Sequence, residues 1–128
     1  MNQLTDVAVS VDLQSVVDSH ERPFVVIDKN YQILAVNKAY EELHGALASD
    51  AIGRACYEVS HGKDYPCSEE GEECPHEHVF TKGEPKVCAH VHCDNNHHMH
   101  QVRVSAVPLK GKDDEIYLGE CIEEILSL

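Results

Sequence analysis

The C-terminal third of the chain constrains the fold most strongly, because it consists of strand-forming runs separated by short turns. Residues 86–93, 98–109 and 115–125 are rich in apolar and β-branched side chains. The segments between them, 94–96 and 111–114, hold the Asp, Asn and Gly residues that favour tight turns. Strands joined by such short connections pair antiparallel. The sequence therefore predicts three antiparallel strands in this part of the chain.

The N-terminal part adds a helix and a further hairpin. Between residues 10 and 20 apolar side chains recur at helical spacing, and Ser10 or Asp12 can cap the first turn. Two β-rich runs follow at 24–27 and 32–36, joined by a turn-forming Asp-Lys-Asn. These patterns predict an amphipathic helix followed by a β-hairpin.

Short helices fill the middle of the chain. Asn37 can cap a helix that runs to about His44, a turn or two of helix is expected around 55–59, and Pro75 suits the first turn of another helix. The element order is then helix, two strands, several short helices and three strands. This order is typical of an α+β domain, with a five-stranded antiparallel sheet, short helices on one face and an N-terminal amphipathic helix.

The stretch from Pro23 to about Glu124 resembles PAS domains. The segment PFVVIDKNYQILAVNKAYEELHG is similar to their first hairpin and the helix that follows it. Further matches are IGR at 52–54, KGEP at 82–85 and VRVSAVPLK at 102–110. The resemblance implies a PAS-like fold and a sensory or regulatory role in signal transduction.

Four candidate metal ligands lie in one segment: Cys56, His61, Cys67 and Cys74. Thiolates and imidazoles are the usual protein ligands of zinc, and thiolates also hold iron–sulfur clusters. The spacing matches neither paired CxxC zinc motifs nor the usual ferredoxin motifs, so zinc and an iron–sulfur cluster both stay open. The alternatives are a reversible disulfide between Cys67 and Cys74, or ordinary thiols beside a surface histidine. The segment CYEVSHGKDYPCSEEGEECP is similar to that of a cysteine-rich PAS subgroup, which favours a metal.

A second group of soft ligands could complete that site. Its members project from one face of two predicted strands, because side chains alternate along a strand: Cys88, His90 and His92 on the first, His98 and His100 on the second. Any of the first three is a possible substitute for His61. The alternative is that these histidines lie in solvent near a hairpin tip.

Flavin, a cofactor of some PAS domains, fits this chain poorly. The segment IGRACYEVSHG is similar to the flavin-binding loop of LOV domains, with Cys56 in the place of their adduct-forming cysteine. Ala55, Tyr57 and Ser60 stand where that loop has other polar residues that hold the flavin. We therefore do not expect flavin.

Haem is a further possibility that the resemblance raises. Haem-binding PAS domains take an axial histidine from the helix before the third strand, where this chain has His76 and His78. The spacing of these histidines to Gly83 differs from the family pattern. Haem is therefore less favoured than zinc or an iron–sulfur cluster.

Charge and composition exclude several classes of function. The chain has 10 Lys and Arg against 23 Asp and Glu, a formal net charge of −13, which disfavours direct binding to nucleic acid or anionic lipid. No apolar run approaches the roughly 20 residues of a membrane span, and no secretory signal is apparent, so we expect a cytoplasmic protein. Phosphate-binding glycine loops, nucleophile elbows and HExxH motifs are absent from the sequence, so we expect no enzyme.

These features predict a sensory PAS module, for example in regulation of transcription, with residues 1–22 as a helical cap and 23–128 as the PAS domain. The signal would be redox state or a small ligand at a Cys/His metal site. The alternative is a protein-interaction or metabolite-binding module with a purely structural zinc or a thiol switch. Because the apolar face of residues 10–20 has little else to cover, we also expect a homodimer. The downstream signalling protein stays unknown.

Overall fold

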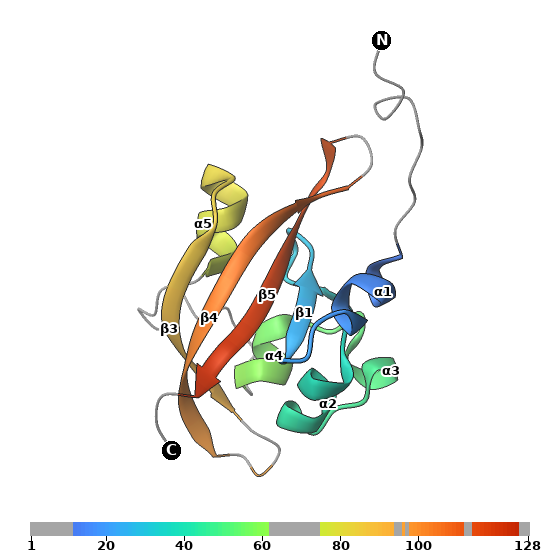
Figure 1. Ribbon diagram of the computed structural model, residues 1–128, viewed down its shortest axis with the longest axis vertical. Helices are drawn as coiled ribbons and strands as arrows, with labels where there is room; N and C mark the ends of the chain where they lie inside the picture. Colours follow the sequence, from blue (N-terminus) through green and yellow to red (C-terminus); the bar gives the residue numbers. More distant parts are fainter. Residues whose placement is uncertain (1–11, 62–74, 94–95, 97, 112–113, 126–128) are drawn as a thin grey trace.

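A computed structural model describes residues 12–61, 75–93, 96, 98–111 and 114–125. Its centre is a five-stranded sheet in the order β2-β1-β5-β4-β3 (Figure 1). The helices and strands are α1 (Leu13–Asp18), β1 (Phe24–Ile27), β2 (Ile33–Val36), α2 (Lys38–His44), α3 (Ala48–Ala51), α4 (Cys56–His61), α5 (Pro75–Lys82), β3 (Lys86–Cys93), β4 (Met99–Lys110) and β5 (Ile116–Ile125). The predicted α+β architecture with a five-stranded antiparallel sheet is confirmed.

All neighbouring strands of the sheet pair antiparallel. The β1–β2 hairpin and the three C-terminal strands were both predicted, and both form. The two units join through β1 and β5, with Phe24 opposite Cys121 and Ile27 opposite Leu118. This long-range pairing places β5, the last strand in sequence, at the centre of the sheet.

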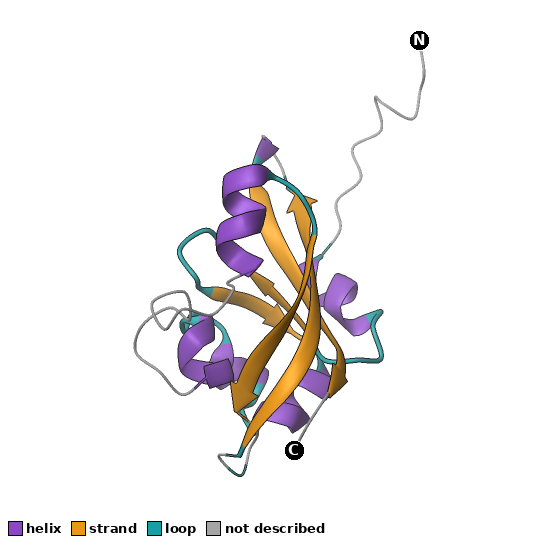
Figure 2. Cartoon of the chain, turned by 90° about the vertical axis from the view of Figure 1, so that its left-hand side faces the viewer, coloured by secondary structure: helices purple, strands orange, loops and turns teal. Residues whose placement is uncertain are grey.

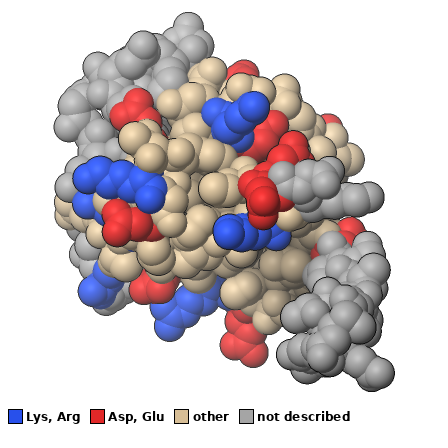
Figure 3. All heavy atoms as spheres, turned by 90° about the horizontal axis from the view of Figure 1, so that it is seen from above, with Lys and Arg blue, Asp and Glu red and all other residues tan. Residues whose placement is uncertain are grey.

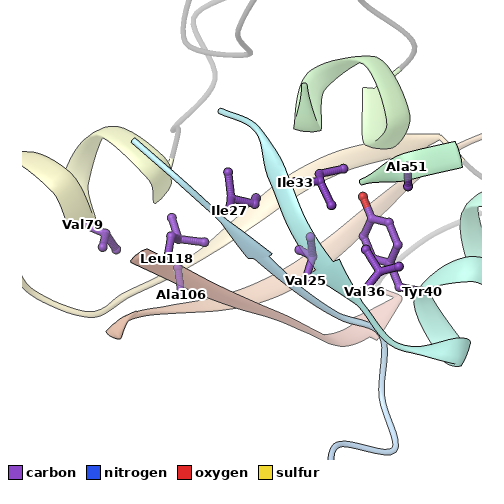
Figure 4. Close-up of a cluster of buried hydrophobic side chains, with 9 residues drawn as sticks. All are labelled: Val25, Ile27, Ile33, Val36, Tyr40, Ala51, Val79, Ala106 and Leu118. Atoms are coloured by element: carbon purple, nitrogen blue, oxygen red, sulfur yellow. The ribbon is translucent and has the colours of Figure 1, made fainter. Parts of the chain in front are cut away.

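The short helices α2 to α5 pack on one face of the sheet, called here the inner face. Side chains of these helices and inward side chains of the strands together form a hydrophobic core. Figure 4 draws its buried members: Val25, Ile27, Ile33, Val36, Tyr40, Ala51, Val79, Ala106 and Leu118. Burying this much apolar surface is the main favourable contribution to folding. Within the described part of the chain, no helix is both long and apolar enough to cross a membrane.

The N-terminal helix α1 lies on the opposite, outer face of the sheet, so helices flank the strands on either side (Figure 2). Its Val17 is 0% exposed and packs against Phe24, Val26 and Ala35. Asp12 caps the helix by accepting a hydrogen bond from the Gln14 backbone N–H, as predicted. Ser10, the other predicted cap, lies outside the described residues.

This position of α1 corrects one step of the sequence argument. The apolar face of α1 was expected to have little to cover within the chain, and that expectation is wrong because it covers the outer face of β1 and β2. An uncovered apolar face of α1 was the reason to expect a homodimer. The homodimer stays a prediction, but the apolar face of α1 no longer supports it.

The predicted boundaries of the other helices agree closely with the structure. Asn37 caps α2 by accepting from the Tyr40 backbone N–H, and Gly45 ends the helix with a φ of 67°. That left-handed conformation favours glycine, because a side chain there would crowd the backbone. Pro75 begins α5 as expected.

Candidate functional site

The predicted metal ligands lie only partly within the described structure. Cys56 begins α4 and packs against the inner-face core. Cys67, Cys74 and the side chain of His61 lie outside the described residues. Among the residues that are described, no group of three or more His, Cys, Asp or Glu side chains is arranged to hold a metal ion. The four-ligand site therefore stays a prediction.

The proposed substitute ligands sit on β3, and two of them face inward. Cys88 and His92 are buried, whereas Val87 of the same strand is largely exposed, so the predicted alternation holds. The register pairs His92 directly with His100 of β4, as the predicted opposition of the two histidine stripes requires. The His90 backbone follows the same strand, and its side chain lies outside the described residues.

A set of polar side chains is buried between the inner face of the sheet and the helices α2 and α4. We call it the buried polar cluster, and its members are Tyr40 and His44 of α2, Ser60 of α4, His92 of β3 and Glu120 of β5. Polar groups removed from water cost free energy unless other polar groups compensate them. Their concentration in one place makes this the most distinctive chemical feature of the described interior.

Tyr40 links the two helices at one end of the buried polar cluster. Its hydroxyl oxygen lies 2.7 Å from the Ser60 hydroxyl, and its ring lies 4.4 Å from the His44 ring, centroid to centroid. Burial raises the pKa of Tyr40 far above its ordinary value, the Ser60 hydrogen bond opposes this, and the nearby Cys56 and Glu120 raise it further. Tyr40 is therefore a neutral hydrogen-bonding group in the native protein.

His92 and Glu120 form the other end of the cluster, on the sheet. The His92 Nε2 lies 3.8 Å from a Glu120 carboxylate oxygen, and both side chains are less than a tenth exposed. The His44 ring lies 5.5 Å from the His92 ring and connects this pair to Tyr40. A buried carboxylate is costly unless a positive or hydrogen-bonding group faces it, so the His92 imidazole is a compensating partner that becomes an ion pair when protonated.

This cluster was not predicted as a site, although the sequence carries a signal for part of it. Glu120 interrupts the apolar side chains of Leu118 and Ile122, which share its face of β5. A carboxylate on the core face of a strand is a detectable anomaly. Tyr40 and His44 are spaced by one helical turn, which places both on the buried side of α2.

A second contact region lies at the β1–β2 turn and joins α4 to α5. We call it the aromatic clasp: the Tyr31 ring stacks on His76 at 3.8 Å and meets Tyr57 edge-on at 5.7 Å. The His76 Nε2 lies 2.9 Å from the Asp28 carbonyl oxygen, and burial lowers the pKa of His76. To bind a haem iron through this nitrogen, His76 would have to give up the hydrogen bond to Asp28.

Comparisons with known proteins agree on the family. A family model of the PAS fold matches residues 17–126. A search of curated protein sequences finds no match. A PAS domain of a protein from Colwellia psychrerythraea is 18% identical with a TM-score of 0.67, covering 97% of this chain and 98% of that one.

Two further solved structures share the fold. The PAS domain of BvgS from Bordetella pertussis is 17% identical with a TM-score of 0.58, over 97% of this chain and 86% of that one. The PAS domain of nitrogen regulation protein NR(II) from Vibrio parahaemolyticus is 10% identical with a TM-score of 0.68, over 91% of this chain and 100% of that one. At these identities the likeness is one of fold, and together with the match over residues 17–126 it means that this chain belongs to the PAS-fold family.

Proposed function

We propose that this domain is a sensory module in signal transduction, not an enzyme, and that it receives its signal at the buried polar cluster. The observation that supports the proposal is the burial of Tyr40, His44, Ser60, His92 and Glu120 in one place of a small interior. Burying a polar side chain costs free energy because the side chain gives up its hydrogen bonds to water, and other polar groups must offset that cost. Costs of this kind concentrate where a protein needs a responsive site.

We further propose that the signal is redox state or a metal-dependent change at Cys56. This thiol packs against the same hydrophobic core cluster as Tyr40, and negative charge at Cys56 raises the pKa of the buried Tyr40 hydroxyl. Metal binding or oxidation at Cys56 would alter that charge, and Tyr40 would pass the change to Ser60 and His44. With His61, Cys67 and Cys74 of the same segment, Cys56 would hold zinc or an iron–sulfur cluster, in keeping with the proposed cysteine-rich subgroup.

Of the possible substitute ligands Cys88, His90 and His92, the structure describes the side chains of Cys88 and His92, and their place supports keeping them. Both lie on the inner face of β3, and α4, which carries Cys56, packs against this strand. The second candidate function, a module with a structural zinc or a reversible disulfide, uses the same cysteines. Metal content and thiol chemistry therefore separate the two.

To test the metal assignment, the protein is purified without oxygen, and its visible spectrum and elemental metal content are measured. We expect stoichiometric zinc or iron in the wild type, and loss of that metal in Cys56→Ala. Cys121→Ala is the matched control, because Cys121 packs on the outer face of the sheet beside α1. A metal-free wild type, or equal metal in both variants, would contradict the metal assignment.

A sensor and a structural zinc differ in their response to metal removal. A signal-receiving site should change its spectrum or local exchange rates on oxidation or chelation while the domain stays folded, whereas removal of a structural zinc should unfold it. We expect the folded response. Circular dichroism before and after chelation decides the matter, and complete unfolding would favour the structural zinc.

Charge bears on the partner that such a module would contact. The face of the molecule shown in Figure 3 carries Lys and Arg side chains interspersed with Asp and Glu. The whole chain nevertheless has a net charge of −13. This excess of negative charge supports a protein as the downstream partner and disfavours direct contact with nucleic acid or an anionic membrane.

A further inference from the structure

The buried polar cluster and the N-terminal helix lie on opposite faces of the sheet, so any signal from one to the other has to pass around or through it. The two regions meet at a hydrogen-bonded junction where β2 ends at Val36 and α2 begins after Asn37. We propose that Asn37 is a positioning residue that transmits the state of the buried polar cluster to α1. This inference deepens the proposed sensory function, on which its biological meaning rests.

The side chain of Asn37 makes four hydrogen bonds. Its Oδ1 accepts from the backbone N–H groups of Tyr40 and Phe24, each at 3.0 Å. Its Nδ2 donates to the carbonyls of His20 at 3.0 Å and Arg22 at 2.8 Å. Asn37 is 3% exposed. A carboxamide has two donor hydrogens and an acceptor oxygen with two lone pairs, so this side chain is fully used.

These four partners belong to three different parts of the chain. Tyr40 is in α2, Phe24 begins β1, and His20 and Arg22 lie in the linker between α1 and β1. The carboxamide group is planar and rigid, so a displacement of its oxygen with α2 also moves its nitrogen against the linker carbonyls. Asn37 therefore couples the position of α2 mechanically to the end of α1.

A second hydrogen bond fixes α1 to the same junction. The Gln14 side chain, in the first turn of α1, donates to the carbonyl oxygen of Val36 at 3.0 Å. Val17, in the last turn of the helix, packs on the outer face of the sheet. Helix α1 is thus held at its start through Gln14 and just beyond its end through His20, and both contacts lead to residues 36 and 37.

The other side of the junction leads into the buried polar cluster. The N–H that Asn37 caps belongs to Tyr40, whose hydroxyl meets Ser60 and whose ring meets His44. A change at the cluster that shifts α2 consequently displaces its N-cap. The path is a continuous set of short contacts from the inner to the outer face, around the end of the edge strand β2.

The test is a double-mutant cycle read by amide hydrogen exchange. Tyr40→Phe perturbs the cluster by removing one hydroxyl, and Asn37→Asp keeps both acceptor contacts while replacing the donating NH₂ by an oxygen. The readout is exchange of the Val16 amide of α1 and of the Ser19 and His20 amides just after it, which bond to carbonyls of α1. Amides of the β4–β5 ladder report global unfolding and serve as the reference.

We expect Tyr40→Phe to raise exchange in α1 about fivefold in the wild-type background. In the Asn37→Asp background, the same substitution should change it by less than about 1.5-fold. A purely structural Asn37 would give the same factor in both backgrounds. That result, or no effect of Tyr40→Phe on α1, would overturn the proposal.

A second pair of variants keeps the test open if Asn37→Asp does not fold. Gln14→Ala cuts the other contact of α1 with the junction, and Ser15→Ala, at an exposed position of the same helix, is its matched control. Tyr40→Phe should act on α1 by less than about twofold in Gln14→Ala and keep its full effect in Ser15→Ala. If Tyr40→Phe changes exchange in α1 by the same factor in both variants, the junction at residues 36 and 37 does not transmit the change. No metal or ligand enters this experiment, so its outcome is independent of the metal analysis.

Discussion

At the scale of single residues, the pair formed by His92 and Glu120 is the most consequential feature of the interior. The Glu120 carboxylate lies on the central strand beneath the helices, where water solvates it little. Its protein neighbours therefore determine the free-energy cost of burying it. Removing one partner of a buried charged pair leaves the other poorly compensated, whereas replacing both by apolar groups is often tolerated. The pair therefore predicts strong coupling between two substitutions.

We expect His92→Leu alone to lower the free energy of unfolding by about 3 kcal/mol, because Glu120 then loses its imidazole neighbour. Adding Glu120→Leu should recover most of that loss. Urea unfolding of the wild type, both single variants and the double variant measures the coupling. Costs that simply add would show that the two side chains do not compensate each other.

At the scale of secondary-structure elements, local sequence patterns predicted where helices and strands lie in the sequence better than how they are arranged in space. The strand at 86–93, the Asn37 cap and the helix start at Pro75 were readable because each depends on residues close in sequence. The pairing of β1 with β5 was not, since it joins segments as far apart in the sequence as Phe24 and Cys121. Nor could the spacing of Leu13, Val16 and Val17 show which face of the sheet α1 would cover.

The candidate site divides in the same way. Alternation along the strand correctly placed Cys88 and His92 on one face. It could not bring His92 next to Glu120 or His44, because those contacts depend on the order of strands and on the packing of α2. The metal prediction at Cys56, His61, Cys67 and Cys74 stays untested by the described residues.

The aromatic clasp provides a prediction about how elements are joined. His76 contributes both a stacked ring against Tyr31 and a hydrogen bond to the Asp28 carbonyl, and it thereby ties α5 to the β1–β2 turn. His76→Phe keeps the ring and loses the hydrogen bond, so we expect a cost of about 1 kcal/mol. His76→Ala loses both and should cost about 3 kcal/mol. Thermal and urea unfolding check the order, and equal costs would mean that the stack contributes nothing.

At the scale of the whole molecule, the structure bears on where the domain begins. The sequence divides the chain into a cap of residues 1–22 and a domain of 23–128. In the structure, α1 is an integral layer on the outer face, and Val17 is buried against β1 and β2. The family match also begins at residue 17, within α1. A protein cut at residue 23 would expose Phe24, Val26 and Ala35 on that face.

We therefore expect a chain of residues 23–128 to be less stable than the full chain by about 3 kcal/mol or more, because it loses the burial of Val17 and uncovers a contiguous apolar surface. The uncovered surface should also promote self-association, which light scattering after size-exclusion chromatography would detect as a larger mass. Val17→Ala in the full chain separates the two causes, since it weakens the packing by about 1–2 kcal/mol without uncovering the sheet. If the shortened chain were as stable as the full chain and equally monomeric, α1 would be a separable cap. A signal that passes from the buried polar cluster to α1 would then reach a helix that contributes nothing to the stability of the domain.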